Sequence, residues 1–321
     1  MSRRVVITGG NGFVGRIVVR GLSDLGYQVE VFDLWGGRAV TALRGRYLGT
    51  SRNRWARNGG VVLNRALRES ESVLRRTGVL QPTGDDILAA PTVLLPRFQG
   101  RDAVVHLAAI PLADLPSVGE SDYRRINIDG ALNVFEAARE AGVRKFVFAS
   151  SVAVYGFSRG IAPGTRIEQF PILETNHRPD RPGENTLYAL TKIAVENHLE
   201  RTGPSSETKS VSLRLGAPGF RSSFAPYLGM ATSVQNLVAG FDASLRSEWD
   251  FDFEAFNLMD RHRDPHCSLN LHALITRRWP DVPNRIEGDE MAFSSAKIAA
   301  LLGYRSTRDG TYIDQRIANI K

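Results

Sequence analysis

The stretch Val5-Val6-Ile7-Thr8-Gly9-Gly10-Asn11-Gly12-Phe13-Val14-Gly15 decides the fold of this chain. Its apolar, β-branched start predicts a buried strand, and glycines at positions 9, 12 and 15 predict a tight turn into a helix. Between a strand and a helix, such glycines let the backbone approach a pyrophosphate, and the helix N-terminus offers N–H groups to its phosphates. The stretch therefore predicts a dinucleotide-binding loop.

A second predicted strand, residues 28–32, ends at Asp33. An acidic residue about 20 positions after such a loop is the one that binds the ribose hydroxyls of the adenosine. A glycine triplet alone is a weak signal, because ordinary α/β turns also use glycine. The combination with Asp33 favours the dinucleotide site.

Length and composition bound the class of protein. The chain has 321 residues, of which 42% are hydrophobic, which is enough for a sizeable core in one or two domains. Its single cysteine, Cys267, excludes an internal disulfide and suits a reducing compartment. The first strand is expected by about residue 4, so we expect no signal peptide. Because no apolar run approaches the roughly 18 residues of a membrane helix, we expect a soluble, cytoplasmic protein with no membrane partner.

The positive charge is concentrated in one segment. The net charge is +7, and residues 36–78 hold ten arginines against two glutamates. Because no nucleic-acid-binding motif accompanies this charge, we expect no nucleic-acid partner. We interpret residues 36–78 as a solvated insertion with one surface helix; the alternative is a basic flap over an anionic cofactor or substrate.

The remaining pattern predicts the fold class. Strands are expected at residues 103–109, 145–151 and 210–215, and helices at 123–141 and 185–201. Strands that alternate with helices favour an α/β fold with a Rossmann-type, doubly wound parallel sheet.

A small C-terminal substrate-binding lobe is expected beyond this unit. Residues 1–215 are assigned to a dinucleotide-binding Rossmann domain, with the insertion 36–78, and residues 216–321 to the smaller lobe, interleaved with the first. The lobe pattern predicts helices at about 230–247, 268–278 and 294–302 and a strand at 255–259.

Tyr188 and Lys192 are candidates for proton transfer. Their spacing of four places both on one face of the helix 185–201. A phenol has an ordinary pKa near ~10, and a neighbouring ammonium lowers it. Ser151 ends the preceding strand and could hydrogen-bond the same substrate oxygen. We therefore interpret these three residues as an acid–base site.

Together these motifs resemble those of the extended short-chain dehydrogenase/reductases, the NAD-dependent epimerase/dehydratase family. The resemblance covers most of the chain and is specific for residues 3–33 and 103–215. The matching stretches are Thr8–Gly15, Asp33, His106–Ala109, Asn127–Val134, Ser150–Gly156, Tyr188 with Lys192, and Phe293–Tyr304.

The resemblance implies hydride transfer to or from NAD. Tyr188 would be the acid/base, Lys192 would hold the nicotinamide ribose, Ser151 would orient the substrate oxygen, and Asn127 would support the site. Asp33 favours NAD because its carboxylate would repel a 2′-phosphate, and the nearby Arg38 keeps NADP as the less favoured alternative. The implied cofactor contacts are Gly9, Gly12, Phe13, Val14, Gly15, Asp33, Asp86, Ile87, Leu107, Ala108, Ala109, Tyr188 and Lys192. The implied substrate contacts are Ile110, Ser151, Val152 and Arg221.

The chain also departs from the family's nucleotide-sugar epimerases. Those enzymes usually carry an Asn shortly after the strand that ends in Leu-Arg, but here Leu213-Arg214 precedes Leu215-Gly216-Ala217-Pro218-Gly219. The Arg-Asp-Tyr-containing stretch is replaced by Met230–Val234. These departures look more like the uronate dehydrogenase branch, in which Arg221 would bind a substrate carboxylate through two hydrogen bonds.

Three functions stay open. The preferred one is net oxidation of a carbohydrate-like hydroxyl. The second is a nucleotide-sugar epimerase or dehydratase with tightly bound NAD, and the third is an NAD(P)-binding sensor without catalysis. A homodimer through the helices 123–141 and 185–201 is implied by the resemblance.

Two further groups are not assigned to chemistry. His262, His266 and Cys267 match no common zinc spacing, so no metal is expected. His106 is interpreted as a packing residue.

Overall fold

The computed structural model describes residues 3–33, 85–111, 118–158, 160–218, 228, 230–262 and 270–306. The arginine-rich segment 36–78, Arg221, His266 and Cys267 lie outside the described residues.

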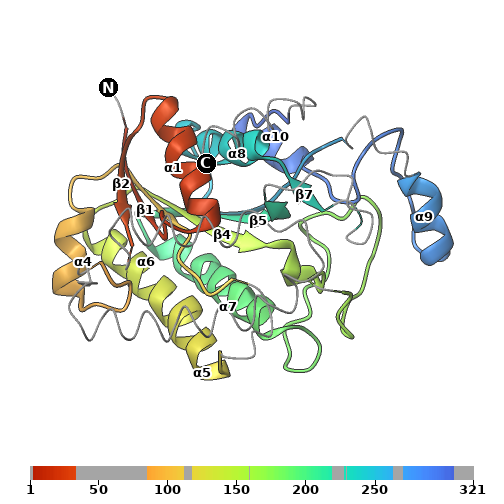
Figure 1. Ribbon diagram of the computed structural model, residues 1–321, viewed down its shortest axis with the longest axis horizontal. Coiled ribbons are helices and arrows are strands. Elements are labelled where there is room, and N and C mark those ends of the chain that lie inside the picture. Colours follow the sequence, from red (N-terminus) through yellow and green to blue (C-terminus); the bar gives the residue numbers. More distant parts are fainter. Residues whose placement is uncertain are drawn as a thin grey trace, which may run out of the picture.

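A six-stranded parallel sheet forms the centre of the molecule (Figure 1). Its spatial order is β2-β1-β3-β4-β5-β8, and every neighbouring pair is parallel. This order confirms the expected doubly wound sheet. The strands are β1 (Arg4–Thr8), β2 (Gln28–Phe32), β3 (Ala103–His106), β4 (Lys145–Ser151), β5 (Lys209–Leu215) and β8 (Phe253–Leu258).

Helices cover both faces of the sheet (Figure 1). On one face α1 (Phe13–Asp24), α8 (Val234–Arg246) and α10 (Ala296–Leu302) share a hydrophobic cluster with the strands. On the other face α4 (Pro91–Phe98), α6 (Gly130–Glu140) and α7 (Leu187–Thr202) share a second cluster. Successive side chains of a strand point to opposite faces of the sheet, so each buried strand contributes apolar residues to both clusters. In β1, for example, Val5 belongs to the first cluster and Val6 to the second.

A third cluster lies beyond the carboxyl ends of β4 and β5. It joins the short helix η2 (Val152–Tyr155) and the loop after it to α9 (Leu271–Arg278) and to residues 286–293. Backbone bonds link Phe170 to Pro283 and Ile172 to Ala292. A two-stranded parallel sheet, β6 (Ala217–Pro218) with β7 (Ala231–Thr232), lies between β5 and β8 in sequence.

The expected helix 123–141 is divided into three parts. It consists of α5 (Glu120–Tyr123), a π-helical segment η1 (Arg124–Asp129) and α6. The π segment contains Asn127, whose side chain is buried. Wide turns of this kind often occur at functional sites.

Two predicted boundaries are also corrected. The strand predicted at 103–109 ends at His106, although the Leu107 N–H still donates to the Thr8 carbonyl. The helix predicted at 230–247 begins at Val234, because Ser233 caps it through the Asn236 N–H.

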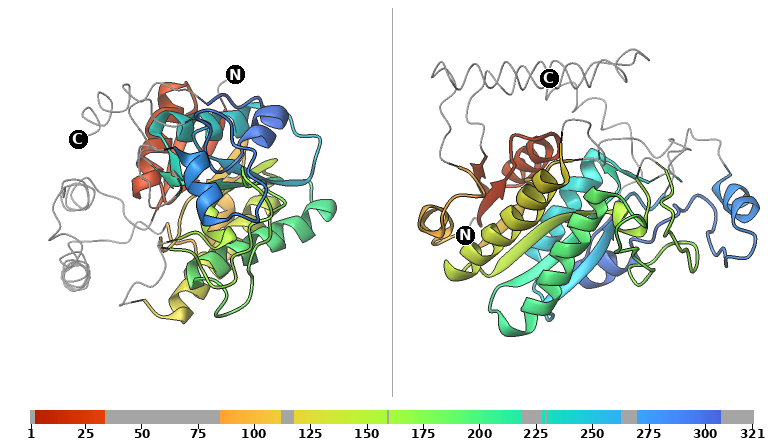
Figure 2. Two further views of the ribbon diagram at one scale, coloured as in Figure 1. Left: turned by 90° about the vertical axis from the view of Figure 1, so that its right-hand side faces the viewer. Right: turned by 90° about the horizontal axis from the view of Figure 1, so that it is seen from below.

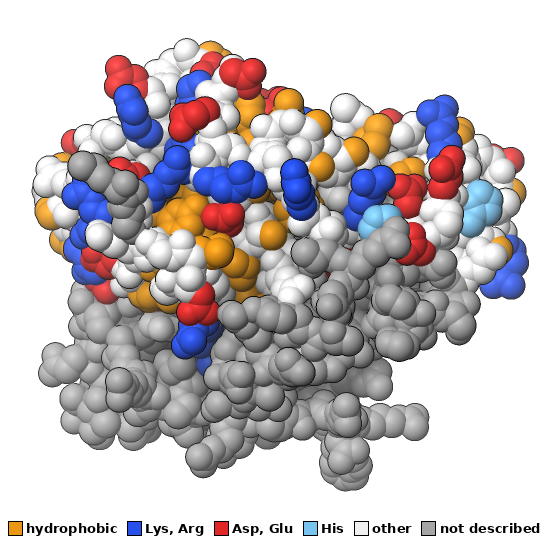
Figure 3. Space-filling view, turned by 90° about the horizontal axis from the view of Figure 1, so that it is seen from above, with side chains coloured by type: hydrophobic (Ala, Val, Ile, Leu, Met, Phe, Trp, Pro, Cys, Tyr) orange, Lys and Arg blue, Asp and Glu red, His pale blue; other side chains and the backbone are white. Residues whose placement is uncertain are grey.

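The described surface carries mixed charge. On the face shown in Figure 3, Lys and Arg side chains are interspersed with Asp and Glu wherever described residues reach the surface. Within the described ranges, no helix is long and apolar enough to cross a membrane.

Gly21 tests the packing of α1 on α8. A Cβ at Gly21 would lie 2.3 Å from a methyl carbon of Val238. Alanine favours a helix over glycine by about 1 kcal/mol, but overpacking costs about 1–3 kcal/mol. We expect Gly21→Ala to lower the free energy of unfolding, and Val238→Ala in the same chain to restore most of it. Urea unfolding of both single variants and the double variant measures this; additive effects would contradict it.

Candidate active site

The glycine loop lies between β1 and α1. Gly9 has a φ of +71°, and a Cβ there would lie 2.6 Å from the Ala108 backbone nitrogen. A Cβ at Gly15 would lie 2.2 Å from the Gly9 carbonyl oxygen. Gly12 is the N-cap of α1, and among the described residues no side chain caps that helix. The loop therefore brings a helix N-terminus to the carboxyl edge of the sheet with no side chains filling the turn.

Asp33 follows β2 beside this loop. Its Oδ2 accepts the Asn11 N–H at 2.9 Å, which fixes the carboxylate against the glycine turn. Of the other predicted loop contacts, Phe13 has 53% of its surface exposed and Val14 is half-buried. An exposed aromatic residue at the start of a helix is available to cover a ligand.

Asp86 and Ile87 occupy the segment before α4. Asp86 accepts the Leu88 N–H at 2.9 Å, and Ile87 is buried against Gly130 of α6. Asn133 of α6 donates to the Ile87 carbonyl at 2.7 Å. The segment that holds both residues is thereby attached to α6.

Leu107, Ala108 and Ala109 continue from β3 along the same edge. Ile110 follows them, and its N–H and carbonyl both bond to the Asn127 side chain, at 2.7 Å and 3.1 Å. Asn127 also donates to Thr191 Oγ1 at 3.2 Å. The π-helical turn thus connects the segment after β3 to α7.

The structure brings Ser151, Tyr188 and Lys192 together. Ser151 ends β4, and its hydroxyl forms a hydrogen bond with Tyr188 and accepts the Ala153 N–H at 3.2 Å. Lys192 Nζ lies 5.6 Å from the centre of the Tyr188 ring and donates to the Ala149 carbonyl at 2.8 Å. Val152, the next predicted substrate contact, is buried directly after Ser151.

Burial shifts the pKa values of both titratable groups. Desolvation raises the pKa of Tyr188 to about 12, with the Ser151 hydrogen bond opposing the rise. Desolvation lowers the pKa of Lys192 to about 7, with the carboxylate of Glu196 opposing the fall. With this pKa Tyr188 is protonated at neutral pH.

An ion cluster that was not expected from the sequence lies behind these residues. Glu196 is fully buried and lies one turn beyond Lys192, and Arg214 of β5 binds its Oε2 at 2.7 Å. A signal for Glu196 was present in the sequence, because it continues the four-residue spacing of Tyr188 and Lys192.

His106 lies among aromatic rings. It is 1% exposed, its Nδ1 lies 2.8 Å from the Thr8 hydroxyl, and its ring stacks against Phe146 and Phe148. Desolvation and the nearby Lys192 lower its pKa to about 3, so the ring is neutral at physiological pH.

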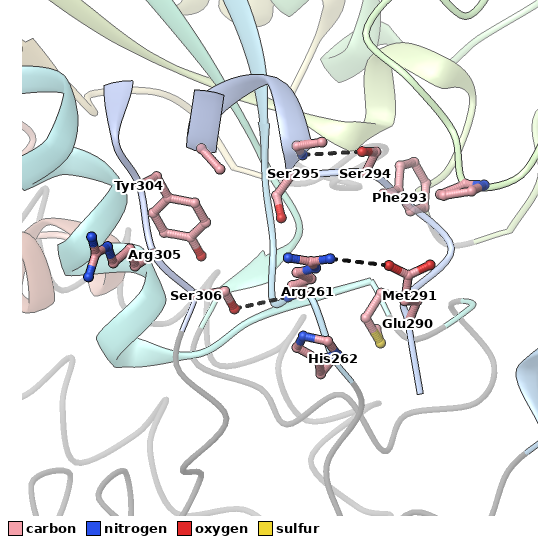
Figure 4. A pocket seen from close by; sticks show the side chains of 13 residues that line it. Arg261, His262, Glu290, Met291, Phe293, Ser294, Ser295, Tyr304, Arg305 and Ser306 are labelled. Atoms are coloured by element: carbon pink, nitrogen blue, oxygen red, sulfur yellow. Dashed lines mark hydrogen bonds and ion pairs between the residues drawn. The ribbon is translucent and has the colours of Figure 1, made fainter. Parts of the chain in front are cut away.

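A cleft of about 560 Å³ lies elsewhere, beyond β8 (Figure 4). Arg261 points across it toward Glu290, with 3.7 Å between their charged atoms. His262 lines the cleft and pairs with Asp289 at 2.8 Å. None of the described predicted site residues lines it. In the described ranges, no group of three or more His, Cys, Asp or Glu residues could hold a metal ion.

A family profile described as "NAD dependent epimerase/dehydratase family" matches residues 53–219. UDP-glucose 4-epimerase 2 of Oryza sativa subsp. japonica is 32% identical over 224 residues, which cover 67% of this chain and 45% of that protein. UDP-glucose 4-epimerase of Streptomyces lividans is 29% identical over 205 residues, which cover 62% and 47%. The chain spans about half the length of the curated relatives it matches.

Solved structures share the fold. A UDP-glucose-4-epimerase from Stenotrophomonas maltophila, with bound NAD and formylated UDP-arabinopyranose, has a TM-score of 0.62 at 20% identity, with both chains fully covered. A uronate dehydrogenase from Agrobacterium tumefaciens has a TM-score of 0.59 at 16% identity, over 100% of this chain and 90% of that one.

The Lys192 shift predicts how stability depends on pH. Below about pH 7 both folded and unfolded chains keep the Lys192 proton, so burial of the charge destabilises the fold. Between pH 7 and 10 the unfolded chain binds more protons, so stability rises with pH. Between pH 7 and pH 9, we expect the free energy of unfolding of the ligand-free protein to rise by about 1–3 kcal/mol relative to that of Lys192→Met. Urea unfolding at both pH values measures this, and parallel pH profiles would refute it.

Proposed function

The chain belongs to the NAD-dependent epimerase/dehydratase family, and from this we propose that it is an NAD-dependent oxidoreductase of the extended short-chain type. Hydride would pass between NAD and a hydroxyl or carbonyl of a carbohydrate-like substrate. The observation that carries the proposal is the arrangement of Ser151, Tyr188 and Lys192 at the carboxyl end of β4. The glycine loop opens at the carboxyl edge of the same sheet.

The glycine loop fits the cofactor. Side chains at Gly9 or Gly15 would collide with backbone atoms, so the turn leaves its concave side to a ligand. The α1 N-terminus would hold the pyrophosphate, and Asp33 would hold the adenosine ribose. Asp86 and Ile87 would contact the adenine, while Leu107, Ala108 and Ala109 would support the cofactor along the sheet edge. When bound, NAD supplies the hydride acceptor.

Proton transfer is assigned to Tyr188. Its phenolate oxygen would take the proton of the substrate hydroxyl as that hydroxyl becomes a carbonyl. The Lys192 ammonium would stabilise the phenolate and lower the pKa of Tyr188 from its ligand-free value of about 12. Ser151 would donate a hydrogen bond to the substrate oxygen, and Asn127 would hold the Ile110 backbone beside it. In the reverse direction Tyr188 returns the proton.

Epimerisation is the second candidate. The relatives near 30% identity are UDP-glucose 4-epimerases, which favours transient oxidation with NAD retained. The departures after β5 and at Met230–Val234 favour net oxidation instead. The assignment of Arg221 to a substrate carboxylate remains a prediction.

We extend the proposal to the assembly, the domains and the location. The substrate-side lobe would be formed by residues 216–321, interleaved with the dinucleotide-binding unit of residues 1–215. The homodimer would form through α6 and α7, which lie side by side (Figure 2) and are joined by a Glu136–His198 contact of 3.5 Å. Sedimentation analysis tests the dimer. A cytoplasmic location would suit the single cysteine.

The decisive experiment uses Tyr188→Phe. Purified protein is supplied with NAD and a panel of neutral, acidic and nucleotide-linked sugars, and NADH absorbance and isomerised product are followed. We expect net NADH formation, and a loss of about 10²- to 10⁴-fold in kcat for Tyr188→Phe with NAD affinity retained. Isomerised product without NADH would identify an epimerase. Unchanged activity in Tyr188→Phe would exclude the proposed chemistry.

Gly15 tests the cofactor loop separately. A Cβ at Gly15 would push the Gly9 carbonyl out of the turn, so we expect Gly15→Ala to raise the Kd for NAD at least about tenfold. Gly160→Ala is the control, because nothing lies within 4 Å of its new Cβ. Calorimetric titration measures both, and an equal Kd in the two variants would contradict the assignment of the loop.

A further inference from the structure

Three consecutive residues of β4 each meet a residue of α7. The Ser151 hydroxyl bonds to Tyr188, the Ala149 carbonyl accepts Lys192 Nζ at 2.8 Å, and the Ser150 hydroxyl donates to Glu196 Oε1 at 2.6 Å. The three partners on α7 are spaced by four residues and so lie on one face of the helix.

The Glu196 carboxylate is held from three directions. Besides Ser150, Arg214 of β5 binds it through Nε and Nη2, at 3.0 Å and 2.7 Å, and Arg178 binds Oε2 at 2.6 Å. Glu196 is fully buried and Arg214 is 3% exposed. A buried carboxylate with this many donors is fixed in place, since turning it away from them would leave its charge buried and uncompensated.

We propose that Glu196 is a positioning residue for the Tyr188–Lys192 pair. Locked by Ser150 and Arg214, its carboxylate fixes the register of α7 against β4 and supplies the negative charge that faces the Lys192 ammonium. This inference rests on the proposed function for its catalytic meaning. Glu196 itself does not touch the proposed reacting atoms and acts through Lys192.

The surrounding charges agree with this role. Burial alone drives the Lys192 ammonium toward neutrality, and Glu196 is the group that opposes it, giving a pKa of about 7. Although burial raises the pKa of Glu196, Arg214 lowers it further, so the carboxylate stays ionised. The groups that face this pair from the packed elements are Tyr188, His106, Tyr123, Arg214, Arg178, Tyr155 and Glu174.

Most of these neighbours hold one charge state near neutral pH. His106 has a pKa of about 3 and is neutral, and burial raises the pKa of Tyr155 above its ordinary value. The pKa of Arg214 is raised by Glu196 despite burial, so it stays cationic. Lys192, with a pKa of about 7, is therefore placed to respond to a change in the charge at Glu196.

Two variants of opposite sign test the proposal. Glu196→Gln removes the negative charge, so the pKa of Lys192 falls. Arg178→Met removes a compensating positive charge from the same carboxylate, so the pKa of Lys192 rises. If Glu196 had only a structural role, the two substitutions would not shift the pKa of Lys192 in opposite directions. Arg20→Met, which breaks the exposed Arg20–Asp24 pair, is the control.

The readout is the titration of Lys192 by NMR in ligand-free protein with ¹³Cε-labelled lysine. The chain has five lysines, at positions 145, 192, 209, 297 and 321, so the Lys192 signal is identified by its loss in Lys192→Met. Lys145, whose pKa is lowered by burial to about 8, serves as an internal reference. We expect the pKa of Lys192 to fall by about one unit or more in Glu196→Gln and to rise by about half a unit in Arg178→Met.

The outcomes separate the inference from the proposed function. An unchanged Lys192 titration in both variants, or shifts of the same sign, overturns the inference. If Glu196→Gln does not fold, Arg178→Met decides, because Arg178 lies partly at the surface and its loss leaves Arg214 on the carboxylate. Once a substrate is identified, kcat is measured against pH. The alkaline limb of this profile is expected to shift to lower pH in Glu196→Gln and to higher pH in Arg178→Met. Failure to find turnover in the wild-type protein counts against the proposed function alone, since the NMR titration needs no activity.

Discussion

A buried ion pair joins α7 to the central sheet. Glu196 of α7 and Arg214 of β5 are both removed from water, and each is satisfied only when α7, β4 and β5 pack in one register. Breaking such a pair by loss of one partner typically costs about 3–5 kcal/mol, because the remaining charge stays buried. The same contact therefore disfavours alternative packings of α7. It also fixes the positions of Lys192 and Tyr188, which lie one and two turns before Glu196.

This arrangement gives the region behind the site an excess of positive charge. Lys192, Arg214 and Arg178 lie around the carboxylate of Glu196, and the carboxylate of Glu174 lies near Arg214. A fixed positive field in a site shielded from water stabilises negative charge without reorganisation when that charge forms. The phenolate of Tyr188 is where such charge would form, and the helix N-terminus at Gly12 adds a second positive pole nearer the glycine loop.

Local patterns predicted the architecture but only part of the site. The glycine spacing, Asp33 and the apolar strands determine a parallel sheet because each signal is contained within a few residues. The π-helical turn at Asn127 was missed because one extra residue in a turn leaves the apolar periodicity of 123–141 nearly intact. The Glu196–Arg214 pair joins residues whose contact depends on the packing of β5 against α7, which no local pattern encodes. The start of α8 was misplaced for a different reason, because the local cap at Ser233 was not recognised within the apolar pattern of 230–247.

The position of β8 bears on how the chain is made. This strand pairs with β5 along its length, and its Asn257 accepts the Tyr155 hydroxyl at 2.7 Å while its backbone bonds to Glu174. A ribosome-bound chain that has emerged only to β5 would present one unpaired edge of this strand, the kind of edge that associates with other chains. β5 is therefore paired on both sides only after residues 253–258 have been synthesised, and until then its open edge is exposed to other chains.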